Sequence, residues 1–231
     1  MIDRYTIKCD SSELEQAFQL DHFDNWSIRY NAAPTQLLPV STQNNPKAVQ
    51  LFTWGLMSRL ANNKKLSPKL FNLPLESALT KPSYKKTMTS RRCIIYADGF
   101  YVWKPISKKK LIPYYAHTAD GSPFSMAGIW EEKDEFDDQS TQTFMLISVP
   151  SSRDIAPYQS DMPLILDSQQ KNAWLSQNTD IQQFQNYSAN QSFNLAIHPV
   201  SPLIANVEVD HVDLIKPTNP SDQHGNYTLF G

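Results

Sequence analysis

The sequence predicts a single α+β domain built on a strongly bent β-sheet. Apolar, β-rich runs recur along the chain and change direction at short Gly-containing pairs, which is typical of strands joined by hairpins or sharp bends. Helix-start signals are fewer and lie far apart. Neither an internal repeat nor a linker divides the 231 residues, a length that can bury one substantial core.

The N-terminal elements are a strand, a helix and a longer strand. Residues 4–8 alternate polar and apolar side chains, as a half-buried strand does. Ser12-x-x-Glu15 has the pattern of a capping box and predicts a helix to about Leu20. Residues 48–57 are β-rich and lead into a Trp-Gly pair.

The middle of the chain predicts a loop followed by two bent pairs of strands. Residues 58–75 hold two prolines, three asparagines and several lysines, a loop composition. Residues 92–103 form two apolar runs about Asp98-Gly99, which predicts a hairpin or a sharp bend. Residues 114–130 repeat this pattern about the turn at 119–121.

The C-terminal part adds strands and short helices to the same domain. Its acidic stretch is predicted to be a solvated loop that leads into a strand. Further along the chain, either Asp167 or Ser168 is expected to cap a helix. The elements expected are a loop at 131–138, a strand at 143–149, a helix to Leu175, a second helix at about 179–187 and a strand at 193–200.

Composition and motifs exclude several classes of protein. No apolar run is long enough to span a bilayer, and residues 1–10 lack the apolar region of a secretory signal. The chain has only two cysteines, which indicates a reducing compartment, so the cytoplasm is expected. The absence of CxxC spacing argues against a structural zinc site. With six glycines there is neither a P-loop nor a dinucleotide fingerprint, and HExxH and GxSxG are absent. No cofactor or metal is predicted.

Positive charge is concentrated in residues 59–110. This segment holds 13 of the 21 Lys and Arg residues and only two acids, a charge of +11, whereas the rest of the chain carries −13. Such asymmetry is typical of a face that binds a polyanion. The alternative is a solvated surface whose lysines are balanced in space by acids from other segments.

Several blocks of sequence together resemble a known family. The individual blocks are short, but they occur in a consistent order and spacing from Met1 to about Pro217: RYNAAPT at 29–35, WGL at 54–56, RCIIYADGFYVWK at 92–104, MPLIL at 162–166 and HPVS at 198–201. In this they resemble the SOS response-associated peptidase (SRAP) family of abasic-site processing proteins. The resemblance implies a barrel-like mixed sheet flanked by helices over 1–217, with 218–231 as a C-terminal tail.

The resemblance also implies an unusual reaction. In the family, removal of the initiator Met exposes an N-terminal cysteine, whose α-amine has an ordinary pKa of roughly 7.7–8.0. That amine attacks the aldehyde of an abasic site in single-stranded DNA, and the thiol then closes a thiazolidine, which leaves a stable crosslink. An asparagine, a glutamate and a histidine assist by hydrogen bonding and proton transfer.

This chain departs from the family at three of those four groups. The family opens Met-Cys-Gly-Arg, whereas this chain opens Met-Ile-Asp-Arg, so Ile2 stands at the nucleophile position and its bulk favours retention of Met1. Val102 replaces the glutamate, and Gln159, which does not titrate near neutral pH, replaces the histidine. Only Asn72 remains, and Pro74 replaces a DNA-contacting arginine. Thiazolidine formation is therefore excluded for this sequence.

Other family positions are retained and imply a DNA-binding groove. Trp54 could stack on an unpaired base or simply pack in the core, since both use the same ring face. An asparagine in a loop is more often a turn residue than a catalytic residue, but the match of the surrounding block favours a functional role for Asn72. The positions that the resemblance assigns to DNA binding are Arg4, Asn31, Trp54, Gly55, Asn72, Arg91 and Arg92.

Three functions are compatible with these observations. The first is a degenerate SRAP protein, expected to be monomeric, that binds single-stranded or junction DNA without crosslinking it. The second is an enzyme with altered chemistry, in which the Met1 amine forms a Schiff base with an aldehyde. The third is a protein-interaction role that uses the acidic stretch 131–138 or the Gln/Asn-rich region 176–194.

Overall fold

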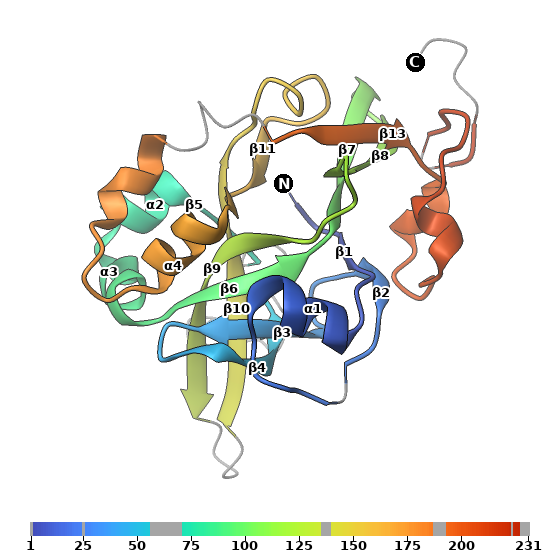
Figure 1. The fold of residues 1–231 in the computed structure, drawn as a ribbon. Coiled ribbons are helices and arrows are strands. Elements are labelled where there is room, and N and C mark those ends of the chain that lie inside the picture. Colours follow the sequence, from blue (N-terminus) through green and yellow to red (C-terminus); the bar gives the residue numbers. More distant parts are fainter. Residues whose placement is uncertain are drawn as a thin grey trace.

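Two β-sheets and a set of short helices form the domain (Figure 1). Within the described part of the chain, the helices are too short or too polar to cross a membrane. The computed structural model describes residues 2–24, 26–55, 71–134, 140–186, 193–222 and 224–226.

The larger sheet closes on itself as a barrel. Its strands follow the order β10-β4-β3-β6-β9, and pairing of β9 with β10 completes the ring. The β4–β10 pair is parallel and the other pairs of the ring are antiparallel, so the predicted barrel-like, mixed sheet is confirmed. The five strands are β3 (Leu37–Thr42), β4 (Asn45–Trp54), β6 (Arg92–Ala97), β9 (Phe124–Asp134) and β10 (Ser140–Pro150).

Short strands extend the barrel at its margin. β5 and β11 both pair with β10, and β12 pairs with β9. They comprise β5 (Asn72–Pro74), β11 (Asp161–Pro163) and β12 (Ile165–Leu166). The pairing of β5 fixes the position of Asn72 within the fold.

The second sheet carries the N-terminal strand. Its order is β13-β8-β7-β1-β2, all antiparallel. The strands are β1 (Tyr5–Ile7), β2 (Arg29–Ala32), β7 (Gly99–Ser107), β8 (Lys110–Thr118) and β13 (Leu195–Pro199). Since β6 belongs to the barrel and β7 to this sheet, the chain crosses between the two sheets at Asp98.

That crossing is a bend and not a hairpin. The buried Asp98 carboxylate accepts hydrogen bonds from Thr6 Oγ1 at 2.5 Å and from the Lys8 N–H at 2.5 Å, which ties the bend to β1. A Cβ at Gly99 would lie 2.3 Å from the ring of Tyr115, so only glycine fits there.

Helices cover the barrel and the second sheet. Helices α2, α3 and α4 lie together at one side of the barrel, and the 3₁₀ turns of residues 202–215 lie at the opposite side of the molecule (Figure 1). The helices are α1 (Ser11–Phe18), α2 (Leu75–Thr80), α3 (Pro82–Ser90) and α4 (Ser168–Leu175), and the 3₁₀ helices are η1 (Ile181–Asn186), η2 (Pro202–Ala205) and η3 (Val212–Ile215).

Some local predictions were wrong. The capping box of α1 is formed by Asp10 and Glu13, two residues earlier than expected. The loop predicted over 58–75 is replaced from Asn72 onward by β5 and the start of α2, while 56–70 lie outside the described residues. The acidic stretch continues β9 as far as Asp134. The predicted cap of α4 is confirmed at Asp167, but the helix expected at 179–187 is 3₁₀.

The N-terminal strand lies inside the main core. Ile2, Tyr5 and Ile7 are fully buried and pack in one cluster with the barrel interior, including Trp54 and Phe144. A smaller cluster under the 3₁₀ turns contains Tyr101, Tyr115, Val200, Ile204 and Leu214. The start of the chain is therefore anchored by apolar burial on both sides of Asp3 and Arg4.

The described part of the C-terminal segment 218–226 is attached to the second sheet. The Thr218 N–H donates to the Pro199 carbonyl at 3.0 Å, and the buried Asp222 carboxylate lies 3.4 Å from Lys110 Nζ. Burial raises the pKa of Asp222, but hydrogen bonds from Asn226 and the His224 N–H, together with Lys110, outweigh it and lower that pKa to about 2. The boundary at 217 stays a prediction.

We expect this attachment to resist acid. Because the pKa of Asp222 is lowered in the folded protein, its contribution to stability is complete above its unfolded pKa of ~3.9 and is lost as the pH falls through about 2. The protection factors of the Asp222, His224 and Asn226 amides, which are corrected for the intrinsic pH dependence of exchange, should be constant down to about pH 4 in the wild type and decline between about pH 4 and 2. Asp222→Asn should exchange faster at neutral pH, whereas Asp213→Asn, which removes an exposed carboxylate paired with Lys216, should not. Equal protection in both variants would contradict this account.

Candidate nucleic-acid interface

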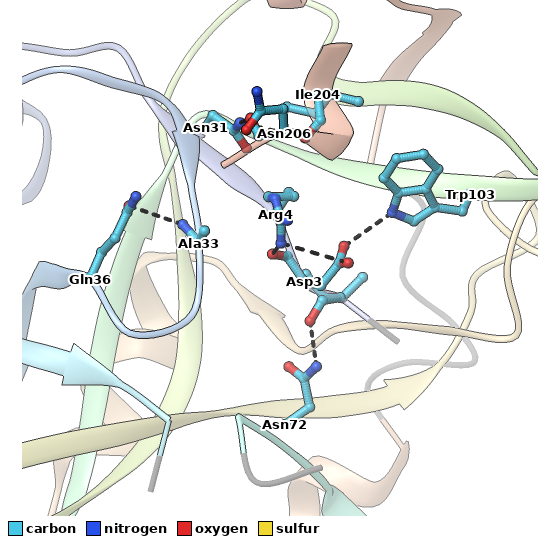
Figure 2. Close-up of polar contacts among 10 residues, drawn as sticks. Asp3, Arg4, Asn31, Ala33, Gln36, Asn72, Trp103, Ile204 and Asn206 are labelled. Carbon is cyan, nitrogen blue, oxygen red and sulfur yellow. Dashed lines mark hydrogen bonds and ion pairs between the residues drawn. The ribbon is translucent and has the colours of Figure 1, made fainter. Parts of the chain in front are cut away.

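The fold brings Asn72 to the N-terminal segment. The side-chain Nδ2 of Asn72 donates to the backbone carbonyl of Ile2, a contact that joins β5 to the segment before β1 (Figure 2). The Oδ1 of Asn72 is buried and accepts no hydrogen bond from the described residues. Asn72 therefore lies directly beside residue 2, the position that the resemblance assigns to the nucleophile.

The two apolar replacements are enclosed in the core. Ile2 and Val102 are both 0% exposed and belong to the main hydrophobic cluster. Val102 stands opposite Tyr114 in the β7–β8 pair. Neither side chain carries a group that can act as a nucleophile or transfer a proton.

Gln159 lines a cavity next to the N-terminal segment. This cavity has a volume of about 570 Å³ and is lined by Asp3, Arg4, Trp103, Tyr158 and Gln159, with apolar margins from Pro105, Leu111 and Ala205. Gln159 Nε2 donates to the Asp161 carbonyl at 2.7 Å. The family's histidine position thus faces the same space as Arg4.

Asp3 holds the polar side of this cavity together. Its Oδ1 accepts a hydrogen bond from Trp103 Nε1 at 3.1 Å, and its Oδ2 lies 3.7 Å from Arg4 Nη1 (Figure 2). Arg4 Nη1 also donates to the Asp3 carbonyl at 2.6 Å. The Arg4 side chain is 12% exposed and that of Asp3 35% exposed, so the arginine is largely occupied by its neighbour.

Asn31 has a structural role. Its buried Nδ2 donates to the carbonyls of Asn206 at 3.0 Å and Val209 at 2.8 Å, which fixes the 3₁₀ region to β2. Its Oδ1 is buried and has no hydrogen-bond partner among the described residues. Asn31 therefore supports the margin of the cavity and does not line it.

Trp54 is a core residue. Its side chain is 0% exposed, lies edge-on to Tyr5 at 5.0 Å between ring centroids and parallel to Phe144 at 6.2 Å, and donates from Nε1 to the Phe71 carbonyl at 2.9 Å. No ring face remains for a base, so core packing is the correct alternative. Gly55 is also buried, has a φ of 109° and donates to the Phe144 carbonyl.

Arg92 is a correction to the predicted DNA contacts. It is 1% exposed, and its guanidinium donates to backbone carbonyls at the ends of α3 and α4, so it cannot reach a phosphate. Burial lowers its pKa to about 10, which still leaves it charged at neutral pH. Arg91 lies over the ring of Trp130 at 5.3 Å, at the junction of α3 and the barrel strand β6, whereas Arg4 precedes β1 of the second sheet.

The basic segment divides between two places. One group of exposed lysines, Lys81, Lys85 and Lys86, lies on and before α3, and the other lies on the β7–β8 hairpin beside the cavity. The hairpin lysines are Lys104, Lys108, Lys109 and Lys110. Arg59, Lys64, Lys65 and Lys69 lie outside the described residues. The +11 charge thus does not form one continuous face over the described part of the segment.

Cysteine offers no substitute nucleophile in the described structure. Cys9 and Cys93 are both buried and unpaired with one another. Burial, followed by the nearby Asp98 and Glu13 carboxylates, raises the pKa of Cys9 to about 12, so its thiol stays protonated near neutral pH. The described residues also contain no group of three or more His, Cys, Asp or Glu side chains that could hold a metal ion.

Comparison with known proteins settles the family. The family model described as "SOS response associated peptidase (SRAP)" matches residues 1–207. This chain is an SRAP-family protein. The abasic site processing protein YobE of Bacillus subtilis is 29% identical over 185 residues, which cover 78% of this chain and 84% of the relative. YedK of Escherichia coli, also named an abasic site processing protein, is 27% identical over 193 residues, covering 82% and 84%.

Solved structures confirm the SRAP-like fold. A crystal structure of a protein from Bacteroides thetaiotaomicron superposes with a TM-score of 0.75 at 18% identity and covers 93% of this chain and 99% of its own. A Bordetella bronchiseptica protein gives a TM-score of 0.70 at 18% identity, covering 86% and 99%. At these identities the likeness establishes the fold alone.

The sequence of this SRAP chain did not predict the contact between Asp3 and Trp103. The one feature that pointed to a role for Asp3 is that it replaces the family's glycine beside a retained arginine, Arg4. Met1, whose amine carries the Schiff-base alternative, lies outside the described residues, as do parts of the two segments considered for protein interaction.

Proposed function

We propose that this SRAP protein binds single-stranded or junction DNA noncovalently, through the cavity at Arg4 and the adjoining β7–β8 hairpin, and does not crosslink it. One observation carries the proposal: the positions of the nucleophile and the glutamate hold Ile2 and Val102, both fully buried and apolar. The peptidase in the family's name has no support in these residues. We place the protein in the cytoplasm, as a monomer.

DNA as the ligand is supported by the relatives and by charge. YobE and YedK are named abasic site processing proteins, and the family match extends over the segment that holds Arg4 and Asn72. Lys104 and Lys108 lie on the hairpin that borders the cavity. Cations beside a cavity with aromatic side chains are typical of sites that bind single strands.

Binding should therefore depend steeply on salt. Each phosphate that the protein neutralises releases counterions, with a slope of about −0.7 per contact for single strands. Fluorescence anisotropy of a labelled single-stranded oligonucleotide between 50 and 200 mM salt, a range over which such contacts give large changes, measures this slope. Absent or salt-independent binding would overturn the proposed function.

Lys108 should contribute one of these contacts, because it is exposed on the β7–β8 hairpin, whereas the charge of Arg4 is balanced by Asp3. We expect Lys108→Gln to weaken binding similarly for all DNA sequences and to reduce the magnitude of the salt slope by about 0.7, because one cation is lost. Lys85→Gln, which removes an exposed cation on α3, is the matched control and should leave the slope unchanged. If Lys85→Gln changes the slope and Lys108→Gln does not, the interface lies on α3 instead.

A further inference from the structure

The cavity beside the N-terminal segment presents hydrogen-bond acceptors. The Asp3 carboxylate is about one-third exposed and receives one hydrogen bond, from Trp103 Nε1, on Oδ1. Gln159 uses its Nε2 for the Asp161 carbonyl, which leaves Oε1 as the amide atom available to a ligand. Two acceptor groups thus share one cavity, and the carboxylate is absent from the family's opening pattern, where glycine stands.

Apart from Arg4 and Ser160, the remaining lining is aromatic and apolar. Trp103 and Tyr158 are half-buried, and Pro105, Leu111 and Ala205 complete the walls. A volume of about 570 Å³ falls within the range of ~300–1,000 Å³ found for small-molecule sites. Aromatic walls with a few placed polar groups are suited to a flat ring that carries hydrogen-bond donors.

The charges in the cavity restrict the class of ligand further. The Asp3 carboxylate repels a phosphate group, and Arg4 at 3.7 Å already balances its charge, so an additional simple cation gains little. A neutral planar group with two adjacent N–H donors suits such a carboxylate, which can accept from both at once. Among the DNA bases only guanine has this pair, at N1 and N2. Thymine, cytosine and adenine place an acceptor next to their donor on that edge.

We infer that this cavity binds an unpaired guanine, with the Asp3 carboxylate accepting from guanine N1 and N2 and the ring packing against Trp103 and Tyr158. The inference rests on the proposed DNA binding and names the base that the site selects. Single-stranded recognition of this kind, with a base stacked on aromatic side chains and read on its Watson–Crick edge, is a general mode.

The test compares oligothymidines that carry one central guanine, hypoxanthine, adenine, cytosine or thymine. Wild-type protein should bind the guanine strand roughly tenfold more tightly than the all-thymine strand, which is the scale of a bidentate base contact. Hypoxanthine, which lacks the N2 amino group, should fall between them. Asp3→Asn should bring the ratio of the affinities for the guanine and thymine strands to about one, whereas Asp213→Asn, which neutralises an exposed carboxylate, should keep the wild-type ratio.

The outcomes separate the two proposals. Equal binding of the guanine and thymine strands, or a preference that survives in Asp3→Asn, would overturn guanine recognition and leave noncovalent DNA binding intact. Binding of none of the strands at low salt would overturn both. Because Asp3→Asn also removes a negative charge, the readout is the ratio of the two affinities, which a general electrostatic gain does not change.

Discussion

The triple variant Ile2→Cys, Val102→Glu, Gln159→His should form a DNA–protein crosslink that survives denaturation, whereas the wild-type protein should form none. Cysteine at position 2 is small enough to allow removal of Met1, and it then supplies both an α-amine with a pKa of roughly 7.7–8.0 and a thiol. Glu and His return groups that can transfer protons. Asn72 already lies against the carbonyl of residue 2, so the fourth group is in place.

The matched control replaces cysteine by serine at position 2 in the same background. Serine also permits removal of Met1 but has no thiol, so no stable thiazolidine can close. Both variants are checked for folding, because shortening the fully buried Ile2 costs about 1–2 kcal/mol of stability or more, and Val102→Glu places a carboxyl group at a fully buried position. A folded cysteine variant with an exposed N-terminal cysteine that still fails to crosslink would show that other departures, such as Pro74, account for the loss.

Trp54→Ala should lower the free energy of unfolding by about 3–5 kcal/mol, the cost of removing a large buried aromatic side chain. Trp54 is fully buried between Tyr5 and Phe144, and its Nε1 bond to the Phe71 carbonyl is lost as well. Urea denaturation followed by circular dichroism measures the change. Trp26→Ala, at a half-buried position outside the barrel strands, should cost less.

Trp54→Phe separates packing from DNA contact. It keeps an aromatic ring in the core, so the protein should fold with a smaller loss of stability and bind single-stranded DNA as the wild type does. If Trp54→Phe is stable but loses DNA binding, the base-stacking alternative for Trp54 would be restored.

The sequence predicted the strands well because alternation and turn pairs are local signals. The runs at 92–103 and 114–130 lie in four strands, β6 to β9, as expected. Whether Asp98-Gly99 forms a hairpin or a bend could not be read locally, since the answer depends on Thr6 and Tyr115, which are distant in sequence. α2 and α3 were not predicted because most of their residues are polar and exposed. Their buried apolar residues, Leu75, Ala78 and Met88, are too few to give a helical pattern.

The site was predictable only in part. The resemblance assigned Asn72 and position 2 to the same site, and the structure shows a hydrogen bond from Asn72 to the Ile2 carbonyl. The resemblance assigned both Arg4 and Arg92 to DNA binding, and the burial of Arg92 could not be predicted, because the carbonyls that surround it come from the ends of α3 and α4. The role of Asp3 depends on Trp103, one hundred residues away in the chain, so no local pattern revealed it.

The most direct test of the central claim is one incubation read on two gels. The protein is mixed with a single-stranded oligonucleotide that bears an abasic site, with and without borohydride, and run under native and denaturing conditions. We predict a shift on the native gel alone. A band that survives denaturation without borohydride would contradict it, because a covalent bond would then form despite Ile2, Val102 and Gln159, and a band that requires borohydride would identify an imine at an amine such as that of Met1.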